Sequence, residues 1–435
     1  MIDRATLKRI LNGSPEMTGK MIEKINLWQS MLDGEAPWCN GYVTSLGIEQ
    51  GICREFADVV LGEMEVNITN ERLFKLFEKA TGDLNENLQD GLALGSFCLK
   101  PLGSGQSEFV AADKFVPISF GNDKKPNDIV FFDFRRIDQG KWYVRMERHS
   151  TVNGYLEIKN TAYAASDKYG FDRIVPLDTM AEWAGLPESV AYPGMKQMDF
   201  GYYRNPIKNK VDDTACGVSI YDGPAIERIK RADIQGSRLD WEYESGERAV
   251  HVDPSALRQT ANGDVRSDKL NRRLYRKLNI ERKDGQGLYE VFSPEFRDQN
   301  IVNGLEQYYR QIEFIVGLAY GDLSDPQSVD KTATEVKASK QRKYNRVNAI
   351  QSNLKNCLED FTAGLAFHEG MYSSGYEFSC IFNDSILTDE EAERTRDRAD
   401  VSMGVMSLVE YRMKWYGETE EEAMKHLPVQ NQVME

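Results

Sequence analysis

Apolar residues recur at helical spacing along the stretch from Val336 to His368, which contains no proline and only one glycine, Gly364. Spacings of three and four residues place apolar side chains on one face of a helix. The residues of this face are Val347, Ile350, Leu354, Leu358, Phe361 and Leu365. At a rise of 1.5 Å per residue, a helix of this length spans about 50 Å. The pattern therefore predicts an unusually long helix for a globular protein.

The sequence also indicates where this helix begins. Pro326 disfavours helical backbone at the preceding Asp325. Thr332 and Glu335 have the spacing of a capping box, in which each side chain accepts a hydrogen bond from the other's backbone N–H. We expect a loop over residues 321–331 and a helix over 332–368.

Patterns elsewhere predict a mixed fold. Residues 1–95 have helical periodicity, with expected helices over 46–64, 71–80 after the N-cap Asn70, and 83–94. Between Ser96 and Tyr163 the period changes to two, which predicts short strands in a small antiparallel sheet. A short helix is expected near 179–184.

The C-terminal half returns to helical periodicity. Pro224 suits the first turn of a helix, and residues 296–320 predict another helix. The segment YEFSCIFN reads as a strand, followed by helices capped by Thr388 or Asp389 and by Ser407. The predicted fold class is α+β and mainly helical.

Two groups of basic residues stand out. The first lies at the start of the long helix, where each cation interacts unfavourably with the helix macrodipole, at a cost of a few tenths of a kcal/mol. An anion bound from outside the chain would offset this cost. It comprises Lys331, Lys337, Lys340, Arg342, Lys343 and Arg346. The second suggests an acidic partner and comprises Arg258, Arg266, Lys269, Arg272, Arg273, Arg276, Lys277, Arg282 and Lys283. Both groups are also compatible with ordinary solvated surfaces.

The whole chain is acidic, with a net charge of −15 over 435 residues. This charge argues against a protein that coats nucleic acid, because such proteins need a dominant basic surface. The six cysteines show no CxxC spacing and no paired histidines, which favours free thiols in a reducing compartment. We find no signal-peptide pattern and no run of about 18 apolar residues, so we expect a cytosolic product without a membrane span.

Catalytic motifs are not apparent. The nearest approach to a phosphate-binding GxxxxGK[ST] runs from Gly13 to Met21, where the glycine spacing is wrong and methionine replaces the hydroxyl. The four histidines are widely separated, with no nucleophile motif beside them. We expect no enzyme activity, no cofactor and no metal site.

The order of these segments resembles that of bacteriophage portal proteins, especially the group from tailed phages and prophages of Gram-positive bacteria. A loop, then Lys-Thr-Ala-Thr-Glu-Val, then a long helix resembles the tunnel loop and tunnel helix of that family. The segments CREFADVVLGEMEVNIT, MDFGYYRNPIKNKVDDTACGVSIYDGPAIERIKRAD and FNDSILTDEEAERTRDRADVSMGVMSLVEYRMKWYGETEEEAM resemble other parts of it. The resemblance covers roughly residues 45–425 and is thin over 96–190.

The resemblance implies a portal fold with wing, stem, clip and crown regions. Its boundaries here would be 1–218 for the N-terminal wing, 219–247 for the first stem helix, 248–296 for the clip, 297–320 for the second stem helix, 321–331 for the tunnel loop, 332–368 for the tunnel helix, and 369–435 for the crown.

The implied function is a homo-oligomeric ring, commonly a dodecamer, at one capsid vertex of the virion, assembled in the host cytoplasm. The ring would be the channel for packaging and ejection of double-stranded DNA. Implied partners are the terminase large subunit, a head-completion adaptor, scaffolding protein and the major capsid protein. The candidate DNA-channel residues are Gln327, Ser328, Lys331, Lys337, Lys340 and Lys343. The candidate clip residues for partner docking are Arg266, Lys269, Arg272, Arg273, Arg276 and Lys277.

Two alternatives remain open from sequence. One is another phage head structural or scaffold-associated protein without a DNA channel. The other is a metal-dependent nucleic-acid-processing enzyme that uses the carboxylates between Asp384 and Glu393. Those acids also fit an ordinary helix N-terminus, where the dipole favours negative charge.

Overall fold

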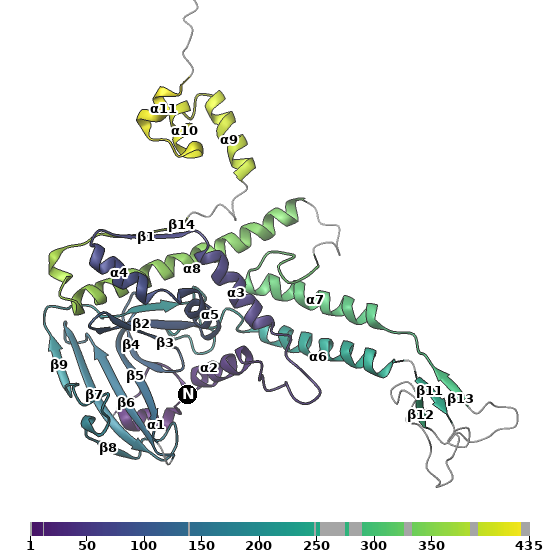
Figure 1. Ribbon diagram of the computed structural model, residues 1–435, viewed down its shortest axis with the longest axis horizontal. Helices are drawn as coiled ribbons and strands as arrows, with labels where there is room; N and C mark the ends of the chain where they lie inside the picture. The colour runs from purple at the N-terminus through teal and green to yellow at the C-terminus, as the bar shows by residue number, and fades with distance from the viewer. Residues whose placement is uncertain are drawn as a thin grey trace, which may run out of the picture.

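The computed structural model describes residues 2–11, 13–137, 140–247, 249–252, 275–277, 289–325, 333–382 and 390–427. The chain is 44% helical and 21% strand, so the predicted α+β class is confirmed. Figure 1 shows a body of helices and sheets from which one pair of helices projects.

The described residues of the N-terminal part of the body form five helices. They are α1 (Arg4–Leu11), α2 (Gly19–Leu32), α3 (Ile48–Leu61), α4 (Glu71–Ala80) and α5 (Leu84–Leu94). The predicted cap of α4 is confirmed, because the Asn70 side chain accepts a hydrogen bond from the backbone N–H of Leu73 at 3.1 Å.

One boundary in this region was predicted wrongly. The helix expected to reach Met64 ends at Leu61, and the next residues form the strand β1 (Met64–Ile68). β1 pairs antiparallel with β14 (Phe378–Phe382), the strand that was predicted near the C-terminal end. Because of this pairing with a distant segment, Met64 lies in a strand although its apolar spacing continues the helical pattern. The pairing also joins the N-terminal helices to the segment that follows the long helix.

The predicted antiparallel strands divide between two sheets. The first has the order β10-β2-β3 and consists of β2 (Ser96–Gly103), β3 (Gln106–Ala111) and β10 (Gly201–Arg204). The second has the order β4-β5-β6-β7-β8, with β9 also paired to β7. Its strands are β4 (Phe115–Phe120), β5 (Pro126–Arg136), β6 (Trp142–Ser150), β7 (Leu156–Ala165), β8 (Arg173–Val175) and β9 (Ser189–Tyr192).

The sheet region differs from expectation in several details. The segment of β4 was not among the predicted strands, and β8 and β9 lie beyond Tyr163, where no strand was predicted. The helix expected near 179–184 is wrong, because only a single 3-10 turn at Leu177–Thr179 precedes irregular turns. Trp183 in this segment is buried, and its indole N–H donates to Asp133 of β5 at 3.1 Å. Anchoring to the sheet therefore replaces helical structure there.

Two antiparallel helices project from the body and end at a small sheet (Figure 1). α6 (Pro224–Ser245) leads outward and α7 (Asp298–Val316) returns. Between them lie β11 (Ala249–Val252), β12 (Tyr275–Lys277) and β13 (Tyr289–Phe292), with β11 in the centre, parallel to β12 and antiparallel to β13. Pro224 occupies the first turn of α6, as predicted.

Polar contacts join the outer ends of these two helices. The Arg297 guanidinium donates to both carboxylate oxygens of Glu242, at 3.1 and 2.6 Å. This hydrogen bonding holds the pKa of Glu242 below its usual value. Closer to the body, Gln235 donates to the carbonyl of Ile301 at 3.3 Å. The helix pair is therefore joined along its length as well as through the distal sheet.

The predicted long helix is present as α8 (Ala333–His368), with 36 residues. Its six predicted apolar residues are all buried in the main core. α8 approaches β10 so closely that a Cβ on Gly201 would lie 2.2 Å from the carbonyl oxygen of Cys357. The predicted cap residue Thr332 lies outside the described residues. α8 is thus the element against which the body packs.

The last described helices follow β14. They are α9 (Glu390–Ser402), α10 (Leu408–Tyr416) and α11 (Glu420–Lys425). The predicted cap Ser407 is confirmed as a capping box with Glu410, whereas Thr388 and Asp389 lie outside the described residues. Within the part of the chain described here, no helix combines the length and apolarity that crossing a membrane requires.

Candidate functional site

The candidate DNA-contacting region lies where α7, the following loop and the start of α8 meet. α7 ends at Val316 and is capped by Gly317, whose φ of +94° is a left-handed conformation that glycine adopts without steric cost. The chain then turns back, and the first turns of α8 lie beside the end of α7 (Figure 1). Residues 318–325 form the described root of the predicted tunnel loop.

A single buried carboxylate holds this loop root. Glu313 of α7 is fully buried and accepts hydrogen bonds from the backbone N–H groups of Gly321, Leu323 and Ser324, at 3.1, 2.8 and 2.8 Å. The Ser324 hydroxyl adds contacts of 3.0 Å to both carboxylate oxygens. A carboxylate needs several donors to be stable in a buried position. The loop root therefore has one defined conformation.

Lys343, one of the candidate DNA-channel residues, is largely buried and paired within the chain. Its side chain is 9% exposed, and its ammonium group pairs with Glu55 of α3 at 2.5 Å and with Asp322 of the loop root at 3.0 Å. Burial alone would lower the pKa of Lys343, but the two carboxylates outweigh it and raise the pKa. Within one subunit this lysine therefore links α8 to α3 and to the loop root through ion pairs. The proposed DNA-contacting set below does not include it.

Two arginines of the basic group also have partners within the chain. The Arg342 guanidinium lies over the rings of Phe314 and Tyr320, with centroid distances of 4.9 and 5.3 Å. Cation–π contacts of this kind stabilise by about 0.5–1 kcal/mol where the site is exposed. Arg346 packs beside Gly317, and burial lowers its pKa. Internal contacts therefore account for part of the basic character that suggested an external anion.

Lys340 is the predicted channel residue that the structure places on the surface. It lies on α8 one turn before Lys343, and no described residue forms an ion pair with it. Lys337 also lies on α8, but its side chain is not described. Gln327, Ser328 and Lys331 lie outside the described residues.

The predicted clip residues are described only in part. Arg276 and Lys277 lie on β12, opposite His251 and Val252 of β11, but their side chains are not described. Arg266, Lys269, Arg272 and Arg273 lie outside the described residues. Two members of this group therefore lie on the distal sheet, and the docking role stays a prediction for all six.

A hollow of about 420 Å³ lies beside the loop root, between α7 and α8. It is lined by Phe314, Gly317, Ala338, Gln341, Arg342, Asn345, Arg346 and Ala349. Phe314 is 60% exposed, and the Arg342 guanidinium lies 4.9 Å from the centroid of its ring.

Sequence reasoning missed a buried charge cluster at the other end of α8. His149 of β6 contacts Asp199 through Nδ1 and Glu147 through Nε2, each at 2.7 Å. Asp199 also contacts His368, the last residue of α8, at 2.8 Å, while Lys100 donates to Glu147 at 3.0 Å. Residues so far apart in sequence gave no spacing signal.

This cluster has the character of a structural network. Burial alone would lower the pKa of His149, but Asp199 and Glu147 outweigh it and raise the pKa to about 9. The imidazole is therefore protonated at neutral pH and donates from both nitrogens. A histidine held as a cation between two carboxylates is poorly suited to general base catalysis.

The carboxylates proposed for metal binding are not tested. Asp384 and Asp389 lie outside the described residues, and the side chains of Glu390, Glu391 and Glu393 are not described. Elsewhere in the described ranges, no three histidine, cysteine, aspartate or glutamate side chains come together in a way that suits a metal ion.

Two comparisons with known proteins were informative by their outcome. No protein-family model matches the chain, and no curated protein matches its sequence. We therefore infer a function from the segment order, the geometry of this junction and the family resemblance of the quoted segments.

Proposed function

We propose that this protein is a bacteriophage portal protein, which assembles into a ring at one capsid vertex and forms the channel for double-stranded DNA. The chain would act without catalysis and without a cofactor. Its surroundings would be the virion, and the host cytoplasm during assembly.

The observation that carries the proposal is the spatial order of the C-terminal half. Two antiparallel helices, α6 and α7, lead to and from a small distal sheet, and a rooted loop then leads into the long helix α8 (Figure 1). In a portal these would be the stem, the clip, the tunnel loop and the tunnel helix. The division into wing, stem, clip and crown is part of this proposal.

Ring symmetry would multiply the effect of each exposed cation. A residue that faces the axis of a cyclic assembly appears once per subunit at the same height. Lys340, together with Lys337 and Lys331, would form such a basic level around the duplex. Contacts to phosphates are independent of base sequence, which suits a channel through which the whole genome passes.

The loop root would give the tunnel loop a fixed starting point. Glu313 holds residues 321–324, and Lys343 links Asp322 to α3. Gln327 and Ser328 would then extend from a rigid base towards the duplex. A fixed base limits where the loop can reach, so the loops of neighbouring subunits would meet the DNA at one level.

The distal sheet would be the docking surface for other proteins. In the proposed role, Arg266, Lys269, Arg272, Arg273, Arg276 and Lys277 would meet the terminase large subunit and later a head-completion adaptor. Scaffolding protein and the major capsid protein would contact the ring during assembly. Exposed Val291 and Phe292 on β13 add apolar surface to the same small sheet, across the central strand β11 from β12.

A double substitution tests the DNA-contacting role. We expect Lys337→Glu with Lys340→Glu to leave the ring intact and to lower the amount of DNA retained in heads assembled with this protein. The matched control is Lys355→Glu, an exposed lysine further along the same helix. Normal DNA retention in the double variant, with intact rings, would show that these two lysines do not contact DNA.

A further inference from the structure

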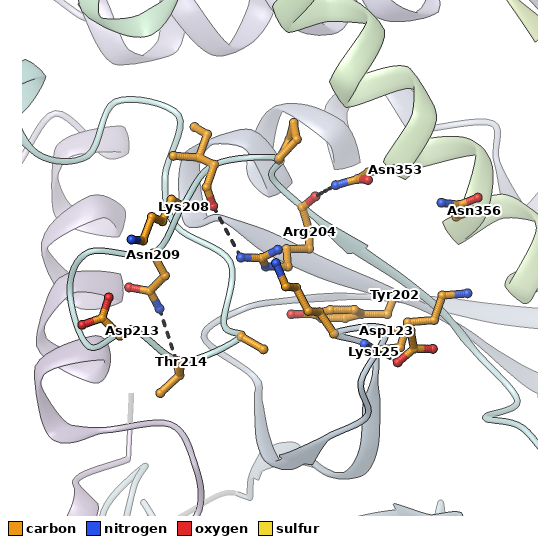
Figure 2. A pocket seen from close by; sticks show the side chains of 14 residues that line it. Asp123, Lys125, Tyr202, Arg204, Lys208, Asn209, Asp213, Thr214, Asn353 and Asn356 are labelled. Carbon is orange, nitrogen blue, oxygen red and sulfur yellow. Dashed lines mark hydrogen bonds between the residues drawn. The ribbon is translucent and has the colours of Figure 1, made fainter.

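A hollow on the body, separate from the α7–α8 junction, has the chemistry of an anion site. Its volume is about 810 Å³, and it lies between the end of β10, the loop that follows it, the turn between β4 and β5, and the middle of α8. Figure 2 shows Arg204 between the loop that carries Lys208 and Asn209 and the turn that carries Asp123 and Lys125.

Cations outnumber carboxylates in the lining of this hollow. Lys124, Lys125, Arg204 and Lys208 line it, against Asp123 and Asp213. Lys125 already pairs with Asp360 of α8. For the other three cations, no carboxylate among the described residues lies within ion-pairing distance. An excess of positive charge therefore remains without an internal partner.

Arg204 is the central member of this group. Its Nη2 donates to the carbonyl of Ile207 at 3.4 Å, whereas its Nε is buried and has no hydrogen-bond partner. A buried donor without a partner is costly, by about 1–3 kcal/mol or more for a charged group. An anion in the hollow would balance the charge of the Arg204 guanidinium, which lines the hollow and has no ion pair with a described carboxylate.

The wall formed by residues 205–215 is held in place by side-chain hydrogen bonds. Asn205 is fully buried and donates to the carbonyls of Leu92 and Val218, each at 2.9 Å. Asn209 donates to Asp212 at 2.7 Å and accepts from the backbone N–H of Val211 at 2.8 Å. The hollow is therefore formed before any ligand enters, which reduces the entropy cost of binding.

α8 contributes the opposite wall. Asn353 donates to the backbone carbonyl of Arg204 at 2.7 Å and so fixes the backbone position of that residue. Asn356, one helical turn further on, also lines the hollow. Figure 2 shows both amides on the α8 side of the hollow, across from the loop that carries Lys208 and Asn209. Amide groups provide neutral donors beside the cations.

We propose that this hollow binds a small molecule that carries two or more phosphate groups. With Lys125 paired to Asp360, three cations remain in the lining against Asp123 and Asp213, and guanidinium and ammonium groups are the donors that phosphate oxygens prefer. The volume lies within the range of small-molecule sites and exceeds what one phosphate would fill. The site lies within one subunit, so it does not depend on the proposed ring or on DNA.

Calorimetry on the purified full chain tests this site, with sodium pyrophosphate and sodium tripolyphosphate as probes at constant ionic strength. We expect a dissociation constant below about 1 mM for the wild type. Arg204→Gln and Lys208→Gln should each weaken binding about tenfold or more, because each removes a charge-assisted contact. Lys210→Gln is the matched control, since Lys210 is exposed on the same loop and does not line the hollow.

Further measurements keep the result interpretable. The thermal midpoint of each variant without ligand shows whether it folds, and Lys124→Gln with Lys208→Gln replaces exposed side chains should Arg204→Gln not fold. Citrate and a short DNA duplex serve as competing anions. The proposal would be overturned if citrate bound as tightly as the phosphate probes, or if the duplex bound and the phosphate probes did not. It would also be overturned if the variants bound the probes as tightly as the wild type, or if binding did not exceed that of the sodium chloride control.

Discussion

The carboxylate of Glu313 accepts hydrogen bonds from both the backbone N–H and the hydroxyl of Ser324, at 2.8 and 3.0 Å. This contact joins the last turns of α7 to the chain segment that leads to α8. It also fixes the point from which the proposed tunnel loop extends, so its loss should affect the loop before it affects the rest of the fold.

Replacement of Glu313 tests this anchoring role. We expect Glu313→Gln to lower the free energy of unfolding by about 2–3 kcal/mol, because the amide group would bring a donor towards backbone donors. Ser324→Ala should cost about 1 kcal/mol, since it removes only the hydroxyl contacts. Hydrogen exchange of the amides of residues 321–324 measures the loop directly. Unchanged protection in Glu313→Gln would contradict an anchoring role.

Lys343 and Lys340 should behave differently when each is replaced by methionine. Lys343→Met would leave Glu55 and Asp322 without their cation, and we expect a loss of about 1–2 kcal/mol after allowing for solvent at Glu55. Lys340→Met, on the exposed face, should change stability by less than about 0.5 kcal/mol. Chemical denaturation of both variants in one buffer provides the comparison. Equal effects would mean that the Lys343 pair does not stabilise the subunit.

The protonated His149 predicts a loss of stability at alkaline pH. Its pKa is raised from 6.5 to about 9, so its contribution is fully present below pH 6.5 and disappears as the pH rises through about 9. The groups that contact or surround it are Asp199, Glu147, Lys100, Arg145 and His368. Nuclear magnetic resonance of the imidazole measures the protonation directly, and titration near pH 6.5 would contradict the ion-pair network.

The raised pKa of Glu49 predicts that the free energy of unfolding also falls as the pH rises, over a lower pH range. Glu49 is 1% exposed, and burial raises its pKa to about 7, with Asp233 adding to the shift. The unfolded carboxyl ionises near pH 4.5, so rising pH favours the unfolded state until the folded group also ionises near pH 7.

The variant Glu49→Gln isolates this effect. Relative to the wild type, we expect it to gain up to about 3 kcal/mol between pH 4.5 and pH 8, because a pKa unit corresponds to 1.36 kcal/mol. Denaturation curves at both pH values measure this difference. A constant gap between the two proteins across that range would mean that Glu49 titrates normally in the folded chain.

Local sequence patterns predicted the main elements well. The apolar face of α8, the proline at the start of α6 and the caps Asn70 and Ser407 depend on contacts within a few residues, and all four are confirmed. We predicted a helix at Met64, but this residue lies in a strand and pairs with Phe382, more than 300 residues later in the chain. Such a pairing leaves no periodic signal in one sequence.

The candidate site was predictable only at the level of composition. The cluster of cations at the start of α8 is visible in the sequence, but the partners of Lys343 come from α3 and the loop root. Sequence spacing does not reveal that one lysine is buried while Lys340, one turn earlier, is exposed. The Asp199 cluster and the hollow around Arg204 likewise depend on residues that the fold brings together from distant segments.

Negative-stain electron microscopy of the purified protein, with native mass on the same sample, tests the proposed function most directly. The proposal predicts closed rings with a central hole wide enough for B-form DNA and a mass that is a whole multiple of the 49.6 kDa subunit. The sample should also be examined at high concentration and with scaffolding protein, which promote assembly. Rings without a hole, open filaments, or no rings under any of these conditions would contradict the portal assignment.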